Sequence, residues 1–398
     1  MTMKVRALAI AILMMAAMWL VGCGHYTCTK GFGATTCGSS NGSGNGNKGS
    51  GNGGTGGTYL FIADAGNVQG ETLDTSTGKI SVTSNFSPIQ LPTNEPGTWM
   101  AVANGTYLYS GYPTIGEIYG WLIAQDGTVS FLNSQQPFPA SFLIAGFSNG
   151  TQAMITNPAG TLLFIADPIN EQVHTFQIGT SGGLTETNAV FMPSGFIPYN
   201  LAMDGLGAYL YVSNVSNGGV TTEVAGFSVG SDGGLTALPN SPFQMSMQQM
   251  QGDSSGKYMI GTTASFFPAD DNVYMSTIQS NGVLSAPVAF AAADSPQLVT
   301  VQPSQGGVLA YTFDLGGGVE GFQISNGALA PVSGSPFNIP GAMGQFDPSG
   351  KFLFVTEESP GSSTNILDVY DVSASSTLTT IFGSVGWSPG AWAVTSTQ

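Results

Sequence analysis

The chain has 398 residues, of which only 8% are charged, and its formal net charge is −16. From Cys23 onward it keeps five lysines, no arginine and all 23 acidic residues, so this part has a net charge of 5 − 23 = −18. Such a surface repels nucleic acid and anionic lipid headgroups, which excludes nucleic acid as a partner.

The first 22 residues have the pattern of an export signal. Lys4 and Arg6 precede the apolar run 7–20, which is too short for a comfortable transmembrane helix. The following LVGC at 20–23 resembles the bacterial lipobox, in which the signal is removed before a cysteine that becomes lipidated. We therefore predict a signal peptide over 1–22 and a lipid anchor on Cys23, with an unmodified Cys23 as the alternative.

A polar segment over 23–57 follows the signal. Cys28 and Cys37 form a disulfide or stay as free thiols, because the segment offers too few further ligands for a metal. Residues 38–57 contain only Gly, Ser, Asn, Thr and Lys, so they predict a flexible tether of roughly 25 Å average span. We expect an exported protein at the bacterial cell envelope, periplasmic or surface-facing at the outer membrane, which meets the membrane only through its anchor.

Residues 58–398 repeat one unit, a turn followed by a short apolar strand. Aligned on one apolar position, the copies are spaced 44 to 55 residues apart and read TYLFIAD (58–64), TYLYSGY (106–112), TLLFIAD (161–167), AYLYVSN (208–214), KYMIGTT (257–263), GVLAYTF (307–313) and KFLFVTE (351–357). A second turn, such as DGT at 126–128 or NGV at 281–283, recurs some 20 residues after each strand. Seven units of four short strands predict an all-β, seven-bladed β-propeller.

The two ends of this region complement each other. The first unit starts directly at its second strand, and the chain ends with an extra strand, AWAVTST at 391–397. We predict that this strand completes blade one and closes the ring, which removes the open sheet edges of a linear array.

His174 is the single histidine of residues 58–398, on the predicted third strand of blade three. Asp167 and Glu171 lie near it in sequence and are candidates to orient it as a general base that activates water. The structural alternative is a strand histidine that is hydrogen-bonded to a neighbour.

Acidic residues also gather on loops. Asp270 and Asp271 are a candidate site for a divalent cation such as calcium, the one cofactor we consider here, although the alternating spacing of a known calcium loop is missing. The ends of the second strands form a ring of positions. We interpret their acids and amides as residues that close the next turn, with binding of a cation or a polar ligand at this rim as the alternative. These positions are Asp64, Tyr112, Asp167, Asn214, Thr263, Phe313 and Glu357.

The phrases PSGKFLFVTE (348–357) and NPAGTLLFIAD (157–167) and the terminators NSPF and GSPF resemble the YVTN-type repeats of the lactonase or 6-phosphogluconolactonase-like propellers. The resemblance spans 58–398 and implies a seven-bladed propeller. It also implies a lactonase-type hydrolase whose site uses His, Arg and Glu. This chain departs from that pattern, because its one arginine, Arg6, lies in the signal.

The missing arginine decides our sequence-based prediction. A phosphorylated lactone requires cationic groups for its phosphate, for which arginine is the usual bidentate partner. We therefore predict a non-catalytic binding or scaffolding module for a small molecule or an envelope component. The alternative is a lactone hydrolase that uses His174 and nearby carboxylates.

Overall fold

The structure is a computed structural model that describes residues 57–398. Its gaps lie at 65–66, 83–88, 91–98, 113–114, 139–152, 216–222, 265–269, 304–308, 315–317, 340, 342, 358–364, 373–377, 388–391 and 397–398. The predicted signal peptide, Cys23, and the tether up to residue 56 lie outside this range and stay predictions. Within the described residues the only helical element is the 3-10 turn Asn133–Gln135, and no helix is long and apolar enough to cross a membrane.

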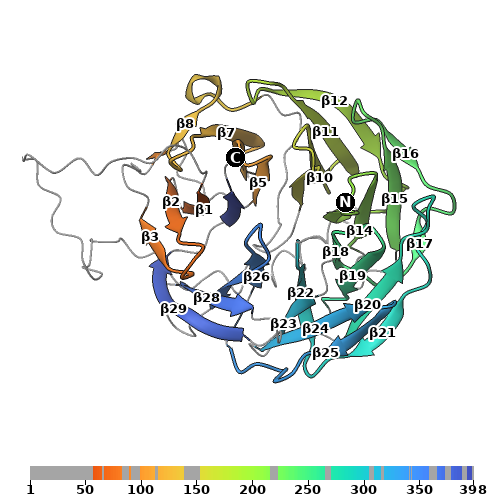
Figure 1. The fold of residues 1–398 in the computed structure, drawn as a ribbon. Helices are drawn as coiled ribbons and strands as arrows, with labels where there is room; N and C mark the ends of the chain where they lie inside the picture. Colours follow the sequence, from red (N-terminus) through yellow and green to blue (C-terminus); the bar gives the residue numbers. More distant parts are fainter. Residues whose placement is uncertain are drawn as a thin grey trace, which may run out of the picture. The chain divides into compact units, whose positions relative to one another are not determined.

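The strands form seven small antiparallel sheets that follow one another around a ring, a seven-bladed β-propeller (Figure 1). The innermost strands of the blades, in blade order, are β30 (Trp392–Ser396), β5 (Trp99–Ala103), β9 (Met154–Thr156), β13 (Pro198–Met203), β18 (Gln249–Gly252), β22 (Pro296–Val301) and β26 (Met343–Phe346). The second strands are β1 (Thr58–Asp64), β6 (Tyr107–Tyr112), β10 (Leu162–Asp167), β14 (Tyr209–Asn214), β19 (Tyr258–Thr262), β23 (Leu309–Asp314) and β27 (Phe352–Glu357).

The outer half of each blade completes the sheet. The third strands are β2 (Asn67–Leu73), β7 (Glu117–Ile123), β11 (Gln172–Ile178), β15 (Glu223–Val229), β20 (Asn272–Thr277), β24 (Val319–Ser325) and β28 (Asn365–Val372). The fourth strands are β3 (Ile80–Val82), β8 (Val129–Phe131), β12 (Leu184–Phe191), β16 (Leu235–Ala237), β21 (Val288–Ala291), β25 (Ala328–Pro331) and β29 (Leu378–Trp387), with short β4 (Ile89–Gln90) and β17 (Phe243–Gln244) added to blades one and four.

The second strands explain why the repeat is so apolar. In β10 every residue is buried, because its two faces pack on two different neighbouring blades. A strand that is buried on both faces reads as a continuous apolar run rather than an alternating one. The hydrophobic core therefore lies between blades around the whole ring.

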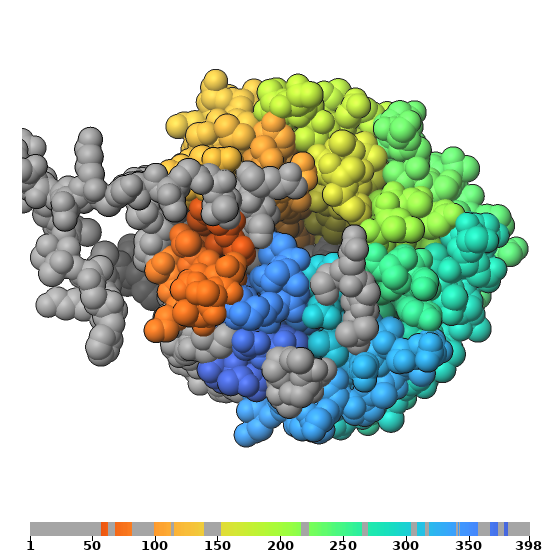
Figure 2. All heavy atoms as spheres, in the orientation of Figure 1, coloured from red at the N-terminus to blue at the C-terminus, as the bar shows by residue number. Residues whose placement is uncertain are grey.

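The predicted closure is confirmed. β30 pairs antiparallel with β1, with Thr58 opposite Ser396 and Ile62 opposite Trp392, so the end of the chain supplies the inner strand of blade one. Figure 2 shows the first blade, in orange, beside the last blade, in blue. The ladder covers the edge that β1 would otherwise expose.

We predict that deletion of residues 391–398 lowers the free energy of unfolding by roughly 3–6 kcal/mol, at about 1 kcal/mol for each lost inter-strand hydrogen bond. Chemical denaturation of the mature chain measures this loss. Deletion of residues 397–398 alone is the control, because pairing ends at Ser396. Equal stability of the two truncated chains would contradict the closure.

Neighbouring blades are also joined by tyrosines of the second strands. The hydroxyl groups of these tyrosines donate to backbone carbonyls in the turn between the third and fourth strands of the next blade. The bonds are Tyr59 to Gln125 (2.8 Å), Tyr107 to Thr180 (2.6 Å), Tyr109 to Gly182 (2.8 Å), Tyr209 to Ser280 (2.9 Å) and Tyr211 to Gly282 (2.7 Å). Between blades seven and one, Lys351 Nζ donates to the carbonyl of Thr75 at 3.3 Å. The two repeated sequence patterns, the apolar second strand and the turn some 20 residues after it, therefore contact each other between neighbouring blades.

Gly282 tests this contact. It has a φ of +81°, and an added Cβ would lie 2.5 Å from the ring of Tyr209. Gly327 occupies the same turn of blade six with a φ of +78°, but there an added Cβ would lie 3.9 Å from Tyr258. Both positions therefore share the backbone cost of a left-handed conformation, and only Gly282 adds a steric clash.

We predict that Gly282→Ala lowers the free energy of unfolding by roughly 2–6 kcal/mol, the sum of backbone strain and overpacking. Gly327→Ala should cost only the backbone strain, roughly 1–3 kcal/mol. Denaturant unfolding of both variants separates the two costs. If the two variants lose the same stability, the tyrosine contact does not constrain the turn.

The structure corrects the sequence alignment of blade six by one residue. Phe322 lies opposite Ala310, just as Phe176 of blade three lies opposite Leu163. The second strand therefore ends at Asp314, and the prediction of Phe313 at this position was wrong. The error arose because Leu309 was taken as the equivalent of Leu163, whereas the strand pairing gives that place to Ala310.

Candidate functional site

The candidate site lies in blade three, where β10 and β11 are joined by a tight turn. Asp167 is the last residue of β10, and its Oδ1 accepts hydrogen bonds from the backbone N–H groups of Ile169 and Asn170, both at 3.0 Å. This is the local turn closure expected for Asp167 from the sequence. The side chain of Asn170 also donates to Asp167 Oδ2 at 2.6 Å, so the carboxylate is held from its own turn.

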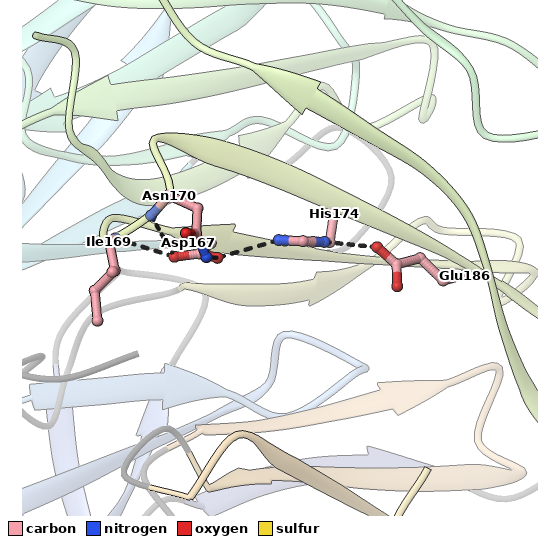
Figure 3. Close-up of polar contacts among 5 residues, drawn as sticks. All are labelled: Asp167, Ile169, Asn170, His174 and Glu186. Atoms are coloured by element: carbon pink, nitrogen blue, oxygen red, sulfur yellow. Dashed lines mark hydrogen bonds and ion pairs between the residues drawn. The ribbon is translucent and has the colours of Figure 1, made fainter. Parts of the chain in front are cut away.

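His174 lies between two carboxylates, as Figure 3 shows. Its Nε2 is 3.2 Å from Asp167 Oδ2, and its Nδ1 is 2.7 Å from Glu186 Oε1. His174 is 2% exposed and Asp167 is fully buried, whereas the side chain of Glu186 is 28% exposed. The group is therefore a buried relay with one end that reaches solvent.

The charges of this relay support one another. Burial acts to lower the pKa of His174, but the hydrogen bonds and charges of Asp167 and Glu186 outweigh it and raise that pKa above its ordinary value. Burial acts to raise the pKa of Asp167, but hydrogen bonds from His174 and Asn170 hold it below its ordinary value. The imidazole is thus biased toward its protonated form, which donates from both nitrogens.

Glu186 was missed by the sequence analysis because a β-bulge sets its position. β11 and β12 change register between Thr175 and Phe176, so Glu186 rather than Thr187 lies opposite Phe176. Because residues two apart on a strand share a face, Glu186 then lies on the face of the sheet that carries His174. Nothing in the local sequence marks this bulge.

Glu171, the other predicted neighbour of His174, lies elsewhere. It sits in the β10–β11 turn with a φ of 53°, and its Oε2 accepts the N–H of Gly195 at 3.4 Å. Of the two predicted partners of His174, Asp167 therefore contacts it, whereas Glu171 contacts Gly195 in the loop after β12. A role for Glu171 in catalysis stays a prediction.

In the predicted cation-binding loop of blade five, both carboxylate oxygens of Asp270 already accept hydrogen bonds from protein side chains. Asp270 Oδ1 accepts from Asn272 Nδ2 at 2.7 Å, and Asp270 Oδ2 accepts from the hydroxyl of Tyr274 at 2.9 Å. Asp271 is exposed, and its backbone carbonyl accepts the N–H of Ala292. Calcium binding by Asp270 and Asp271 stays a prediction. Within the described residues no three His, Cys, Asp or Glu side chains form a group that could hold a metal ion.

Blade six places a second pair of acids on its second and third strands. Asp314 ends β23 and Glu320 lies on β24, and both are nearly fully buried. Burial, together with the negative charges of Glu320 and Asp294, raises the pKa of Asp314 to about 7. Burial and the charge of Asp294 also raise the pKa of Glu320.

The lysines of the described region lie away from these acids. Lys257 and Lys351 are exposed at the start of β19 and β27, whereas Asp167 and Asp314 end their strands. Because equivalent strands of a propeller run in the same direction, the starts and the ends of the second strands lie on opposite faces. Lys79 is exposed beside the outer strand β3. The acidic ends of these strands thus have no lysine beside them among the residues that the structure describes.

We predict that His174→Gln removes a pH-dependent part of the stability. A raised histidine pKa stabilises the fold fully below the ordinary value of 6.5, and this contribution is lost as the pH rises through the folded-state pKa. The lowered pKa of Asp167 stabilises the fold above its ordinary 3.8, and this contribution is lost as the pH falls through the folded-state pKa. The relay is therefore most stabilising between these two ordinary values.

Urea unfolding at pH 6 and pH 9 tests this prediction. At pH 6 the variant should be less stable than the wild type by roughly 3–5 kcal/mol, the usual cost of breaking a buried charged pair, with a smaller deficit at pH 9. His25→Gln, which removes the only other histidine, is the control. A deficit that is equal at both pH values would show that His174 is not protonated in the folded protein.

Part of the chain is similar in sequence to curated 6-phosphogluconolactonases. No family model matches the chain. The 6-phosphogluconolactonase of Yersinia pestis strain Pestoides F is 27% identical over 126 residues, and that of Yersinia enterocolitica serotype O:8 is 26% identical over 127 residues. Each match covers 32% of this chain and 35% of the relative, so the similarity spans about a third of the curated proteins.

Solved structures share the fold over most of the chain. The periplasmic gluconolactonase PpgL of Pseudomonas aeruginosa matches with a TM-score of 0.62 at 13% identity, covering 85% of this chain and 99% of its own. A Lactobacillus plantarum protein matches with a TM-score of 0.62 at 16% identity, covering 85% and 99%. The hydrazine synthase of Kuenenia stuttgartiensis matches with a TM-score of 0.54 at 14% identity, covering 79% and 92%, which shows how widely the fold is used.

These findings confirm the resemblance to the lactonase-like, seven-bladed propellers. They favour the lactonase-like alternative over the non-catalytic binding module that the sequence had led us to prefer. The absence of arginine had been given too much weight, because it argues against one substrate and not against lactone hydrolysis in general.

Proposed function

We propose that this propeller hydrolyses lactones that carry no phosphate group. The observation that carries the proposal is the relay of Asp167, His174 and Glu186, in which one carboxylate reaches solvent and is held by a buried imidazole. The relatives named 6-phosphogluconolactonase and the neighbour named gluconolactonase support the reaction class.

The roles follow from the geometry. His174 has both ring nitrogens within hydrogen-bonding distance of carboxylates and a raised pKa, so it is a poor base. Glu186 is the base in our proposal, because its side chain is partly exposed. The hydrogen bond that His174 Nδ1 donates to Glu186 Oε1 fixes the direction of this carboxylate. Asp167 is a positioning residue that accepts from the opposite side of the ring.

The reaction is the addition of one water molecule. Glu186 takes a proton from water as the water oxygen attacks the lactone carbonyl carbon, and a tetrahedral intermediate forms. Cleavage of the bond between that carbon and the ring oxygen then opens the ring. The leaving oxygen takes up the proton, and a hydroxy acid is the product.

The substrate class follows from the charge distribution. The described lysines are exposed, and the two that begin second strands lie on the face opposite the ends of those strands, while the chain beyond residue 22 has no arginine. A phosphate group would meet a surface of net negative charge without a bidentate partner. We therefore expect neutral sugar lactones rather than 6-phosphogluconolactone. Export to the cell envelope, if the predicted signal and Cys23 anchor function, agrees with an external substrate.

We predict that the mature protein hydrolyses glucono-δ-lactone above the uncatalysed rate and discriminates against 6-phosphoglucono-δ-lactone. Glu186→Gln should lower kcat by roughly 10²–10⁴-fold, the usual contribution of a general base. A pH-stat assay at pH 7 measures both. Glu223→Gln is the matched control, because Glu223 is a half-buried carboxylate on β15 that accepts a hydrogen bond from Gln244 at 2.7 Å.

Three results would contradict this assignment. Equal rates for both lactones would reject the substrate class. Loss of activity in Glu171→Gln but not in Glu186→Gln would move the base to the residue expected from the sequence. A lack of turnover for every lactone tried would return the protein to the class of binding modules.

A further inference from the structure

Blade six places an acid where blade three has its histidine. In blade three His174 lies opposite Ile165, and Asp167 follows two residues later on β10. In blade six Glu320 lies opposite Thr312, and Asp314 follows two residues later on β23. Asp314 is thus the equivalent of Asp167, and Glu320 is the equivalent of His174. The imidazole that blade three supplies from its own side chain is replaced in blade six by a second carboxyl group.

Three buried oxygens of this group make no hydrogen bond of good geometry, although the Thr312 hydroxyl lies near enough to Asp314 to act against the rise of its pKa. They are Thr312 Oγ1, Asp314 Oδ1 and Glu320 Oε2, on side chains that are 0%, 6% and 3% exposed. We call Thr312, Asp314 and Glu320 the blade-six oxygen cluster. A buried polar atom without a partner costs about 1–3 kcal/mol, and more when it is charged, so three of them at one place need an explanation.

The three side chains share one face of the sheet. Thr312 and Glu320 are directly opposite each other, and Asp314 is two residues from Thr312 on the same strand. Ala310 and Phe322 lie on the same face and pack against Ile260 and Met275 of blade five. The oxygen cluster therefore faces blade five, between two packed blades.

A proton held between the two carboxyl groups would remove one of their charges, and the raised pKa of both groups is compatible with it. It would add no cation to the cluster, so calcium binding distinguishes the two arrangements. A metal ion holds its oxygen ligands further apart than a shared proton does, because each ligand lies 2.3–2.6 Å from a calcium ion on its own side. Among the described residues the ion pairs belong to His174, so no described side-chain cation balances this cluster.

We propose that the blade-six oxygen cluster binds a divalent hard cation of the calcium type. Asp314 and Glu320 supply the charge and Thr312 a neutral oxygen. Water completes the shell, because among the residues that the structure describes no third acidic or histidine side chain is in position. An oxygen-only ligand set selects calcium over zinc or copper. The site is distinct from the loop of Asp270 and Asp271 and does not depend on the lactonase proposal.

The loop before β22 orients this site and adds charge at its edge. The N–H of Ala293 donates to Glu320 Oε1 at 2.6 Å, which fixes the carboxylate. Asp294, the next residue, is exposed, and its charge acts on both Asp314 and Glu320. The negative potential of this edge attracts cations from solvent.

The test is calcium binding by the mature protein after treatment with a chelator. Isothermal titration with calcium chloride should show one site per chain, and calcium should raise the unfolding temperature. Glu320→His rebuilds the blade-three pair inside blade six. It should fold, unfold at a higher temperature than the calcium-free wild type, and lose the response to calcium. Asp314→Asn should weaken calcium binding at least tenfold.

Asp270→Asn is the matched control, because it removes an acid of the neighbouring blade and leaves the cluster intact. Retained binding in this variant supports the proposal, whereas lost binding would place the cation in the loop of blade five. Absence of calcium binding by the wild type would overturn the proposal, as would unchanged affinity in both Glu320→His and Asp314→Asn. Because none of these readouts is activity, a failure here leaves the lactonase proposal untouched, and the reverse also holds.

Discussion

The contact between the second strand of one blade and the outer turn of the next is the constraint on which the ring depends. Tyr209 and Tyr211 reach the turn of blade five through hydrogen bonds to its carbonyls, and the left-handed Gly282 leaves room for the ring of Tyr209. The same pairing recurs between other blades, and Lys351 makes a related bond across the closure. Blades two, three and five are therefore positioned by the blade before them, Lys351 joins blade seven to blade one, and β30 makes the series circular. This explains how a chain with so few charged residues holds seven sheets in one ring.

A ring built in this way brings the ends of all second strands to one face. At that face, chemically different residues occupy equivalent positions, and the charge balance of each blade is decided locally. Blade three combines Asp167 with His174 and balances its charge internally. Blade six combines Asp314 with Glu320 and does not. In our proposals one scaffold carries a general-base relay in blade three and a cation site in blade six, in line with the rule that function resides in sites rather than in the fold.

The sequence predicted the fold far better than the chemistry. Seven units and the closing strand could be read from turn residues and apolar runs, because these patterns repeat and each copy supports the others. Glu186 could not be found, because a single bulge places it beside His174 and leaves no mark on the local pattern. Asp314 was displaced by one residue, because two neighbouring apolar residues fitted the alignment and only strand pairing distinguishes them. Strands can therefore be predicted from the repeating sequence pattern. A site whose residues are brought together by strand register is harder to predict.

The most direct test of the account is an NMR titration of the His174 ring in the mature protein, whose only other histidine is His25. We predict that the His174 ring stays protonated above pH 6.5 and that its signals shift when gluconate, the product of lactone hydrolysis, is added. A His174 signal that titrates below pH 6.5 would contradict the relay. If the protein hydrolyses the lactone but the His174 signals do not shift when gluconate is added, the reaction takes place at another part of the propeller.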